Sequence, residues 1–163
     1  MKKRRVPMTE QDATFAAGCF WGVEANFLKL KGVIDTKVGY SGGHVAKPTY
    51  QMVCSDTTGH AEAVRVRFNP EEISFEDLLK EFWAMHDPTT LNRQGPDYGS
   101  QYRSAIFYHN DEQKQAAEKM LTELQQTKQF RHAIVTEILP VGEFYEAEEY
   151  HQKYYQKHNI YRC

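Results

Sequence analysis

Apolar side chains recur along this chain at two spacings, and the order of these spacings limits the possible folds more than any other feature. Alternation of apolar and polar residues marks a half-exposed strand, as in the segment AEAVRVRF at 61–68. A spacing of three to four residues marks an amphipathic helix, as at 111–128, whose apolar stripe runs from Ala117 to Leu124. Segments of the two kinds follow one another in a definite order, so the sequence predicts a topology.

The predicted elements run strand, helix, strand, strand, helix, strand, and then helix and strand again. Strands are expected at 13–18, 33–40, 61–68, 102–109 and 133–139, and helices at 20–32, 74–86, 111–128 and in part of 143–158. The first six elements follow the βαββαβ order of a ferredoxin-like core. We therefore predict an α/β (α+β) fold, a two-layer sandwich with this core plus an additional helix, strand and C-terminal tail. A doubly wound parallel sheet is the alternative.

Two long segments without a periodic pattern interrupt these elements at 41–60 and 88–101. Long irregular loops inside a compact domain are often functional. No repeat, low-complexity tract or linker divides the 163 residues, so the chain is expected to form a single domain. Within it, residues 1–10 are expected to be a flexible head, and residues 143–163 a C-terminal segment that ends in Cys163.

Composition argues against several classes of function. The net charge of −2 gives no reason to expect a nucleic-acid partner. No run approaches the roughly 18 apolar residues of a membrane span. The basic head MKKRRVP also lacks the apolar region of a signal peptide. The protein is therefore expected to be cytoplasmic, with no membrane partner.

The chain contains three cysteines, Cys19, Cys54 and Cys163, at wide spacings. This odd number in a cytoplasmic chain argues against a disulfide scaffold, and no C-x-x-C pair indicates a zinc site. Catalytic or redox thiols are then the alternative to small buried side chains. Cys54, inside YQMVCSD, is interpreted as a packed small hydrophobe. Cys163 follows a polar tail and is either an irrelevant surface thiol or a resolving thiol.

Cys19 lies in the stretch FAAGCFWG, where the first strand gives way to the first helix. If the helix begins at Phe20 or Trp21, the free N–H groups of its first turn favour a thiolate and lower the pKa of the thiol. The two aromatic side chains offer an apolar surface beside the sulfur, and the flanking glycines let another molecule approach. A nucleophilic cysteine is predicted here. The alternative is an inert, buried cysteine in a strand-to-helix turn.

Glu62 falls on the apolar face of the strand at 61–68, together with Val64 and Val66. A carboxyl group in apolar surroundings has a raised pKa and stays protonated near neutral pH, which a general acid requires. The alternative places Glu62 in water at the frayed end of the strand. The nearby loops contribute further polar groups, namely Tyr50, Asp97, Tyr98 and Tyr102.

Two rival classes of function use the same residues differently. A cysteine hydrolase or transferase would pair Cys19 with a histidine that acts as a base. The candidates are His44, His60, His86 and His151, and no local pattern singles one out. His86, in the stretch HDP, is more simply interpreted as a cap for the end of its own helix. The other rival is a non-catalytic module that binds oxidised or apolar peptides.

Three motifs resemble those of the A class of peptide methionine sulfoxide reductases. They are GCFWG at 18–22, PTYQMVCSDTTGHAEAVRV at 48–66 and GPDYGSQYRS at 95–104. The stretch YHQKYYQKH at 150–158 is similar to the family's C-terminal segment. The resemblance covers nearly the whole chain from Asp12 onward and implies an α/β fold with a ferredoxin-like core. It also implies thiol-dependent reduction of methionine S-sulfoxide, free or in proteins, to methionine.

The resemblance implies a chemical role for each of five residues. Cys19 attacks the sulfoxide sulfur and Glu62 protonates the sulfoxide oxygen. Tyr50 and Tyr102 hydrogen-bond that oxygen. Cys19 is left as a sulfenic acid, which Cys163 resolves to a disulfide. Thioredoxin, or dithiothreitol in its place, reduces the disulfide, so neither a metal nor an organic cofactor is implied.

Four further positions match substrate-binding residues of the family. The substrate methyl group would lie against Phe20 and Trp21, while Asp97 and His151 would hold the substrate backbone. The implied partners are thioredoxin and, as substrates, oxidised proteins or free methionine sulfoxide, and the chain is expected to be a monomer. The sequence departs from some relatives at its end, because Cys163 aligns with a first recycling cysteine and a second is absent.

Overall fold

The computed structural model describes residues 10–159, so nearly all of the predicted head and Cys163 lie outside the described residues. The elements are, in chain order, β1 (Gln11–Ala17), α1 (Phe20–Leu28), β2 (Val33–Ser41), α2 (Tyr50–Cys54), β3 (Ala61–Phe68), α3 (Phe75–Ala84), β4 (Arg93–Gln94), β5 (Asp97–Tyr98), η1 (Ser100–Tyr102), β6 (Ser104–Tyr108), α4 (Asp111–Gln126), β7 (Glu137–Pro140), β8 (Phe144–Glu146), η2 (Glu149–His151) and α5 (Tyr154–Lys157).

Within residues 10–159, the main sheet contains six strands in the order β7-β6-β1-β3-β2-β8. Its central four strands, β6-β1-β3-β2, pair antiparallel throughout and have the connectivity of a ferredoxin-like core. The two edges are extended by β7, parallel to β6, and by β8, antiparallel to β2. The predicted core is therefore confirmed, and the antiparallel pairing excludes the doubly wound parallel sheet.

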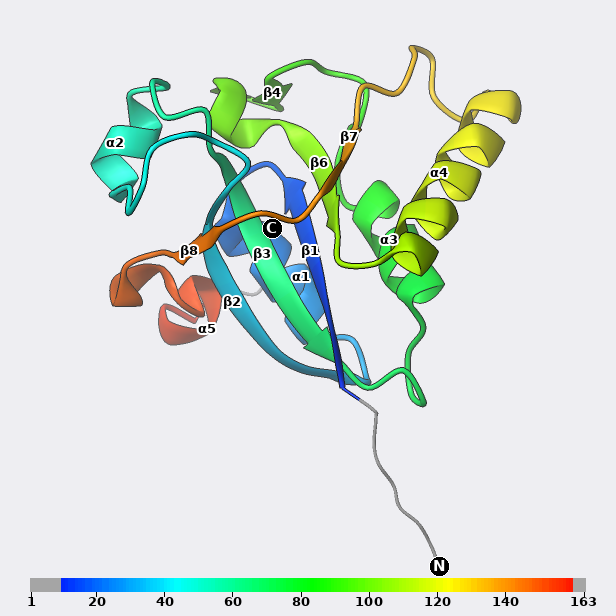
Figure 1. The fold of residues 1–163 in the computed structure, drawn as a ribbon, viewed down its shortest axis with the longest axis horizontal. Helices are drawn as coiled ribbons and strands as arrows, with labels where there is room; N and C mark the ends of the chain where they lie inside the picture. Colours follow the sequence, from blue (N-terminus) through cyan, green and yellow to red (C-terminus); the bar gives the residue numbers. More distant parts are fainter. Residues whose placement is uncertain (1–9, 160–163) are drawn as a thin grey trace, which may run out of the picture.

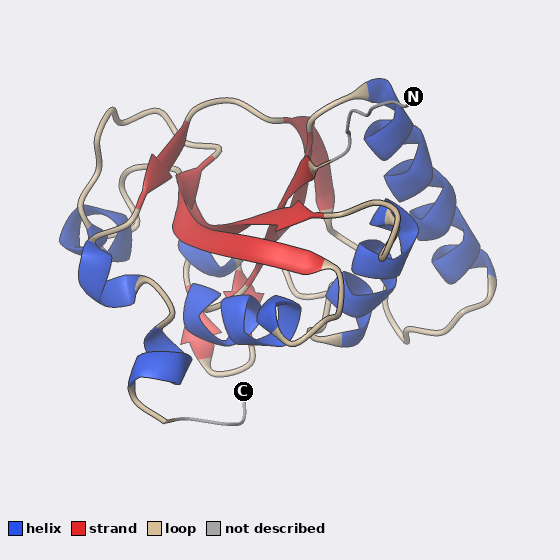
Figure 2. Cartoon of the chain, turned by 90° about the horizontal axis from the view of Figure 1, so that it is seen from below, coloured by secondary structure: helices blue, strands red, loops and turns tan. Residues whose placement is uncertain are grey.

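Helices α1 and α3 lie on one face of this sheet, and α4 packs beside α3 at the edge formed by β6 and β7 (Figure 1). Seen from below, the sheet lies over α1 and α3 as a second layer (Figure 2). Three fully buried phenylalanines join the layers: Phe15 of β1, Phe27 of α1 and Phe82 of α3. The ring of Phe15 stacks on the other two at centroid distances of 5.0 and 5.3 Å. Each buried ring contributes roughly 2–3 kcal/mol, so this cluster holds α1 and α3 against the sheet.

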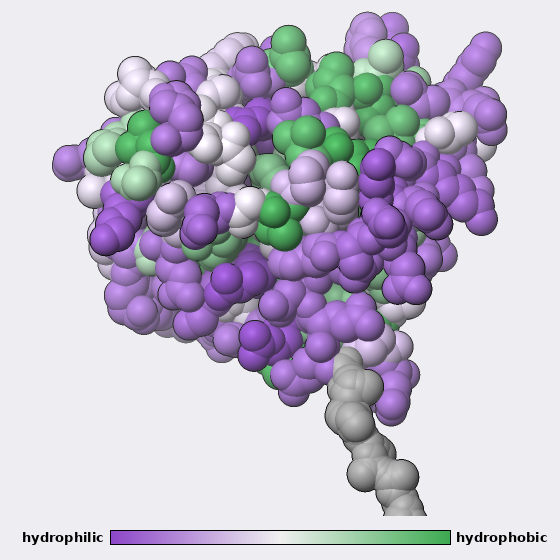
Figure 3. All heavy atoms as spheres, viewed as in Figure 1, coloured by the Kyte–Doolittle hydropathy of each residue, from purple (hydrophilic) through white to green (hydrophobic). Residues whose placement is uncertain are grey.

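The opposite face of the sheet is crossed by the chain between β7 and β8 (Figure 1). Val141 and Phe144 of this crossing pack on a buried cluster of small residues and one ring, namely Ala16, Ala61, Ala63, Ala105 and Phe107. Small side chains let the crossing chain lie close to the strands. The surface on this side is mostly hydrophilic, with apolar groups gathered mainly in its upper half (Figure 3).

Both ends of α3 follow the sequence-based expectation. Ser74 and Asp77 form a capping box, each side chain accepting a hydrogen bond from the other residue's backbone N–H. At the C-terminal end, His86 Nδ1 lies 2.7 Å from the carbonyl oxygen of Phe82 and donates to it. The other ring nitrogen, Nε2, then accepts from Ser104 Oγ at 2.8 Å. His86 is therefore a helix cap, as predicted.

Acid is expected to destabilise the fold through His86. Burial lowers the pKa of His86 from 6.5 to about 4, so the folded protein keeps the ring neutral while the unfolded chain binds a proton. The free energy of unfolding should therefore fall as the pH drops from about 6.5 to about 4. His86 should contribute up to about 3 kcal/mol to this fall and nothing more below about pH 4. Urea unfolding across this pH range measures the loss. An identical pH dependence in His86→Gln would contradict the assignment.

The irregular segments contain more structure than the sequence predicts. The segment 41–60 includes α2, and the segment 88–101 includes the β4-β5 ribbon and the start of η1. The segment 143–158, expected to be helical in part, contains η2 and α5 and in addition the strand β8. The helix expected at 20–32 ends at Leu28, and the last expected strand begins only at Glu137. The short elements inside these segments are two to five residues long, so they show no periodicity and depend on contacts made elsewhere in the fold.

Two general features concern the described part of the chain alone. Between residues 10 and 159, no group of three or more His, Cys, Asp or Glu side chains is arranged to hold a metal ion. Within the same range, none of the helices combines the length and the apolar character needed to cross a bilayer.

Candidate active site

The turn from β1 into α1 places Cys19 at the first end of the helix. Gly18 has a φ of +99°, a conformation that favours glycine. A Cβ at Gly18 would also lie 2.8 Å from the Cγ atom of Gln94, so no larger residue fits. Cys19 is the N-cap residue of α1 and is half-buried. The expected position at a helix N-terminus is therefore confirmed.

The thiol of Cys19 is neutral in the resting protein. Burial and then the charge of Glu62 raise its pKa to about 12, while the N–H groups of Trp21 and Gly22 act in the opposite direction. The expectation of a lowered pKa is therefore wrong, because loss of water outweighs the helix N-terminus. Any reaction of Cys19 as a nucleophile has to remove this proton during the reaction.

Glu62 projects from β3 beside the start of α1 and is 1% exposed. Its Oε1 accepts a hydrogen bond of 3.1 Å from the backbone N–H of Phe20. Burial raises the pKa of the carboxyl to about 8; the Phe20 N–H opposes this shift and the charge of Asp97 adds to it. The other oxygen, Oε2, is buried without a partner among residues 10–159. Glu62 is therefore protonated near neutral pH and holds a free proton donor, and the solvated alternative is excluded.

Two tyrosine hydroxyls lie near this carboxyl. Tyr50 begins α2 and Tyr102 ends η1. Burial raises the pKa of both hydroxyls, and the negative charge of Glu62 raises it further. Both hydroxyls therefore keep their protons and are available as hydrogen-bond donors.

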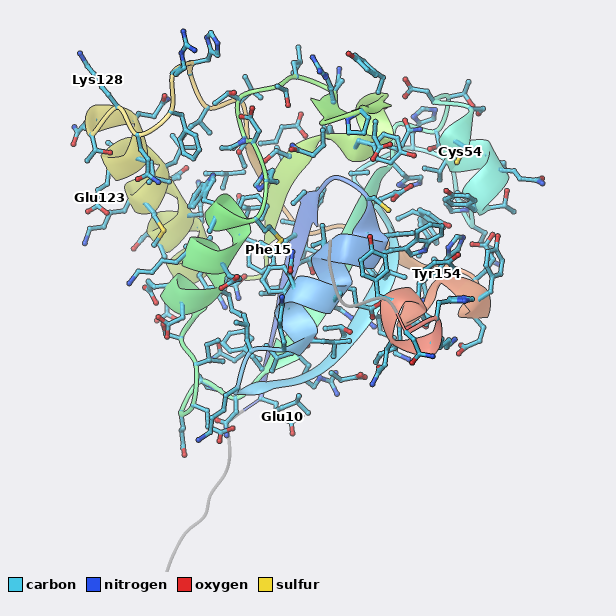
Figure 4. All side chains as sticks on the ribbon, turned by 180° about the vertical axis from the view of Figure 1, so that it is seen from behind. Glu10, Phe15, Cys54, Glu123, Lys128 and Tyr154 are labelled. Atoms are coloured by element: carbon cyan, nitrogen blue, oxygen red, sulfur yellow. The ribbon has the colours of Figure 1, made fainter. Side chains whose placement is uncertain are left out.

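Cys54 lies at the rim of this group rather than in the core. Its side chain is exposed, which contradicts its interpretation as a packed small hydrophobe. Residues four apart share one face of a helix, so α2 presents Cys54 beside Tyr50, and, after burial, the thiol contributes to the raised pKa of the Tyr50 hydroxyl. Figure 4 shows Cys54 on α2 and Tyr154 on α5, with the N-terminal end of α1 facing the side where both lie.

An aromatic group borders Cys19 on the other side. The Phe20 ring is buried, 5.3 Å from the His151 ring and 6.5 Å from the Tyr50 ring. The Trp21 indole N–H donates to His151 Nδ1 at 2.9 Å, and its ring stacks on Tyr154 at 3.8 Å. Since Nδ1 is an acceptor, the proton of His151 is on Nε2. These contacts fix the orientation of Trp21.

His151 lies at the centre of this aromatic group and is fully buried. Burial lowers its pKa, while the charge of Glu148 acts in the opposite direction. The donor at Nε2 has no partner within the described range. The Nε2–H of this neutral imidazole is thus a buried donor that the described residues leave unused.

Asp97 reaches the site from the short β4-β5 ribbon. It pairs with Gln94 in that ribbon, and its charge acts on both Cys19 and Glu62. The Gln94 amide accepts from the backbone N–H of Asp87 at 3.0 Å and donates to the Asp87 carbonyl at 2.8 Å. Because Gln94 also lies against Gly18, it holds the ribbon next to the turn that carries Cys19.

The segment that carries His151 is fastened to the rest of the molecule by its neighbours. The Gln152 side chain accepts from the Val38 N–H and donates to the Val38 carbonyl, both at 2.9 Å, like a short extra strand. The backbone N–H of Lys153 donates to Glu24 Oε1 at 2.8 Å. Glu24 is buried in α1. The C-terminal segment is thus joined to both β2 and α1.

The structure brings eight of the nine predicted site residues into one region, and the ninth, Cys163, lies outside the described residues. The eight are Cys19, Phe20, Trp21, Tyr50, Glu62, Asp97, Tyr102 and His151. The predicted site residues do not include Gln94, Glu148 and Gln152, which hold them in place. They stand in polar stretches where no spacing distinguishes a buried contact from a solvated side chain.

The arrangement distinguishes between the classes of function. Among the hydrogen bonds of the described residues, none joins a histidine to Cys19, so a cysteine hydrolase would lack its base. A neutral thiol beside a protonated carboxyl is instead suited to a reaction in which the sulfur takes up an oxygen atom and the carboxyl protonates that oxygen. The site therefore favours a thiol-dependent oxidoreductase over a cysteine hydrolase.

Known proteins identify this class more closely. The family model described as peptide methionine sulfoxide reductase matches residues 11–163. A relative from Methanosarcina acetivorans, the peptide methionine sulfoxide reductase MsrA, is 62% identical over 147 residues, which cover 90% of this chain and 78% of the relative. The chain belongs to the peptide methionine sulfoxide reductase family, and it reduces methionine sulfoxide with a thiol. The resemblance inferred from its motifs is confirmed.

Solved structures agree with this assignment. The reduced form of Mxr1 from Saccharomyces cerevisiae is 39% identical with a TM-score of 0.86, and the match covers 96% of this chain and 90% of that one. Mxr1 in complex with Trx2 is 30% identical with a TM-score of 0.65, and the match covers 93% of this chain and 89% of that one. The predicted α/β fold is thus shared with members of the family.

Proposed function

We propose that this protein reduces the S epimer of methionine sulfoxide, free or in proteins, with Cys19 as the nucleophile and Glu62 as the general acid. One observation carries this proposal. The Glu62 carboxyl is buried, protonated near neutral pH, and hydrogen-bonded to the residue next to Cys19 through one oxygen only. Its second oxygen is free to protonate a sulfoxide oxygen.

The proposed step balances in atoms and electrons. Cys19 Sγ attacks the sulfoxide sulfur, the sulfur–oxygen bond of the substrate breaks, and the oxygen ends on Cys19 as a sulfenic acid. The substrate sulfur gains two electrons, and the Cys19 sulfur loses two. Glu62 protonates the oxygen and recovers a proton from the Cys19 thiol. The raised pKa of the thiol keeps that proton on the sulfur until the attack.

The remaining residues are proposed to seat the substrate. Tyr50 and Tyr102 donate hydrogen bonds to the sulfoxide oxygen, which their protonated hydroxyls permit. The methyl group lies against Phe20 and Trp21, whose orientation is fixed by the contacts with His151. Asp97 and the Nε2 donor of His151 bind the substrate backbone.

Turnover of both sulfoxide epimers tests this function. With dithiothreitol as reductant, free methionine is expected to appear from the S epimer and almost none from the R epimer. A methionine sulfoxide peptide should react in the same way. Equal rates on the two epimers, or release of methionine from the R form alone, would contradict the proposed epimer preference.

Recycling is proposed to use Cys163, in a single domain whose C-terminal segment, 143–163, delivers that thiol. Cys163 attacks the sulfenic acid at Cys19, water leaves, and a Cys19–Cys163 disulfide forms. Thioredoxin then reduces the disulfide, which is supported by the complex of the yeast relative Mxr1 with Trx2. The cycle needs no metal or organic cofactor. We place it in the cytoplasm, where thioredoxin keeps thiols reduced.

Cys163→Ser is expected to separate the first turnover from recycling. The variant should release about one equivalent of methionine per protein and then stop with thioredoxin, because the sulfenic acid has no thiol to condense with. Mass spectrometry after one equivalent of substrate is expected to show a loss of about two mass units in the wild type and a gain of about sixteen in the variant. Continued turnover of the variant with thioredoxin would give the resolving role to Cys54 or to another molecule.

A further inference from the structure

Glu148 joins three parts of the active site although it faces none of the reacting atoms. Its carboxylate Oε1 accepts from the Tyr40 hydroxyl at 2.9 Å, and its Oε2 accepts from the backbone N–H of Tyr50 at 2.9 Å. Its carbonyl oxygen accepts from the backbone N–H of His151, also at 2.9 Å. One residue thus connects β2, the start of α2 and the aromatic group around Trp21.

The hydrogen bond from the Tyr50 N–H to Glu148 joins the start of a helix to a side chain far away in the sequence. Tyr50 is the first residue of α2, and the N–H groups in the first turn of a helix have no partner within the helix. The cap residue Thr49 accepts from the N–H of Met52 and leaves that of Tyr50 to Glu148. Because α2 is only five residues long, this bond and the Thr49 cap together hold its first turn.

Tyr40 holds the Glu148 carboxylate in a fixed position. Its side chain is fully buried, its ring lies 5.7 Å from that of Phe20, and it pairs with Glu62 across β2 and β3. A carboxylate held by this hydroxyl has a defined position relative to Glu62. The second oxygen of Glu148 accepts from the Tyr50 N–H and so fixes the backbone of Tyr50 relative to Glu62 as well.

The charge state of Glu148 agrees with this arrangement. Although burial acts to raise its pKa, hydrogen bonds from the Tyr50 N–H, its own N–H and the Tyr40 hydroxyl lower it overall. The side chain is therefore an anion at neutral pH. Hydrogen bonds to an anionic acceptor are about twice as strong as those between neutral groups.

We propose that Glu148 is a positioning residue, which acts on sulfoxide reduction by holding Tyr50 where its hydroxyl meets the sulfoxide oxygen. This rests on the proposed function, in which Tyr50 binds that oxygen. Glu148 itself touches neither the substrate nor Cys19 in this scheme. Its effect on the reaction therefore depends on the Tyr50 hydroxyl being present.

A double-mutant cycle tests the proposal. Glu148→Ala is expected to lower kcat for the S-sulfoxide about tenfold when Tyr50 is present and less than twofold in a Tyr50→Phe background. Glu149→Ala is the matched control, because the neighbouring carboxylate is 87% exposed and should leave kcat unchanged. An equal loss of kcat in both backgrounds, or no loss in either, would overturn the proposal.

Amide hydrogen exchange gives a second readout that does not depend on turnover. The Tyr50 N–H should exchange at least about tenfold faster in Glu148→Ala and at the wild-type rate in Glu149→Ala. An unchanged exchange rate would overturn the proposal even if kcat fell. If Glu148→Ala does not fold, Glu148→Gln keeps one acceptor oxygen and is expected to lower kcat about threefold, again only with Tyr50 present.

These readouts separate the two hypotheses. Wild-type and Glu149→Ala turnover reports whether the protein has the proposed epimer-specific activity. The exchange rate of Tyr50 reports whether Glu148 holds α2, whatever substrate the site accepts.

Discussion

Replacing Cys19 with serine is expected to lower sulfoxide reduction at least about a thousandfold. The serine hydroxyl has nearly the size of the thiol, so the N-cap of α1 and the hydrogen bond from Phe20 to Glu62 should persist. A hydroxyl is nonetheless a far weaker nucleophile, and it forms no counterpart of the sulfenic acid. Chromatographic measurement of methionine release with excess dithiothreitol gives the rate.

Cys54→Ser is the matched control for this experiment. Cys54 is exposed and lies beside Tyr50 on α2, and a serine there keeps nearly the size and the polarity of the thiol. The control is expected to keep most of the wild-type rate. If Cys19→Ser retained substantial turnover and Cys54→Ser lost it, the assignment of the nucleophile would be reversed.

Glu62→Gln is expected to slow sulfoxide reduction by about two orders of magnitude or more. The amide oxygen still accepts from the Phe20 N–H, so the start of α1 should remain in place. The amide has no acidic proton to give to the sulfoxide oxygen. Single-turnover methionine release measures this step without the recycling reaction.

The pH dependence of the same step provides an internal check. Since the Glu62 carboxyl has a pKa of about 8, the wild-type rate is expected to decline as the pH rises through that value. The glutamine variant should be slow at all pH values and lack this decline. An equal decline in the variant would show that another group titrates.

Glu62→Gln is expected to raise the stability of the fold near pH 8 although it lowers activity. Burial raises the pKa of Glu62 from 4.5 to about 8, so the unfolded chain loses the proton first as the pH rises. The carboxyl therefore costs the folded protein stability progressively between these two values. The glutamine variant should escape this loss and unfold at higher urea concentration than the wild type near pH 8.

The sequence predicted the core of the fold because its main segments have clear periods. The strand at 61–68 matches β3 residue for residue, and the cap of α3 begins at Ser74 as expected. Alternation in β3 also placed Glu62 correctly on the buried face. In these segments, the residues next to each position along the chain are enough to predict its secondary structure and which face it occupies.

Other features depend on distant contacts that no local pattern encodes. The short helix α2 is held by Glu148, which is 98 residues away from Tyr50 along the chain. The neutral state of Cys19 follows from burial by the folded surroundings and the charge of Glu62, whereas the sequence showed only its place before a helix. For this reason the sequence pointed to residues that the fold brings together but misjudged the protonation of Cys19.

The contact between Trp21 and the C-terminal segment gives the molecule an optical reporter. The chain has two tryptophans, and Trp83 is 4% exposed within the core. The Trp21 indole stacks on Tyr154 and donates to His151, so its emission depends on both neighbours. Detachment of the segment would alter the fluorescence of Trp21 and leave a steady background from Trp83. Stopped-flow fluorescence with unlabelled protein therefore tests whether this segment stays in place during catalysis.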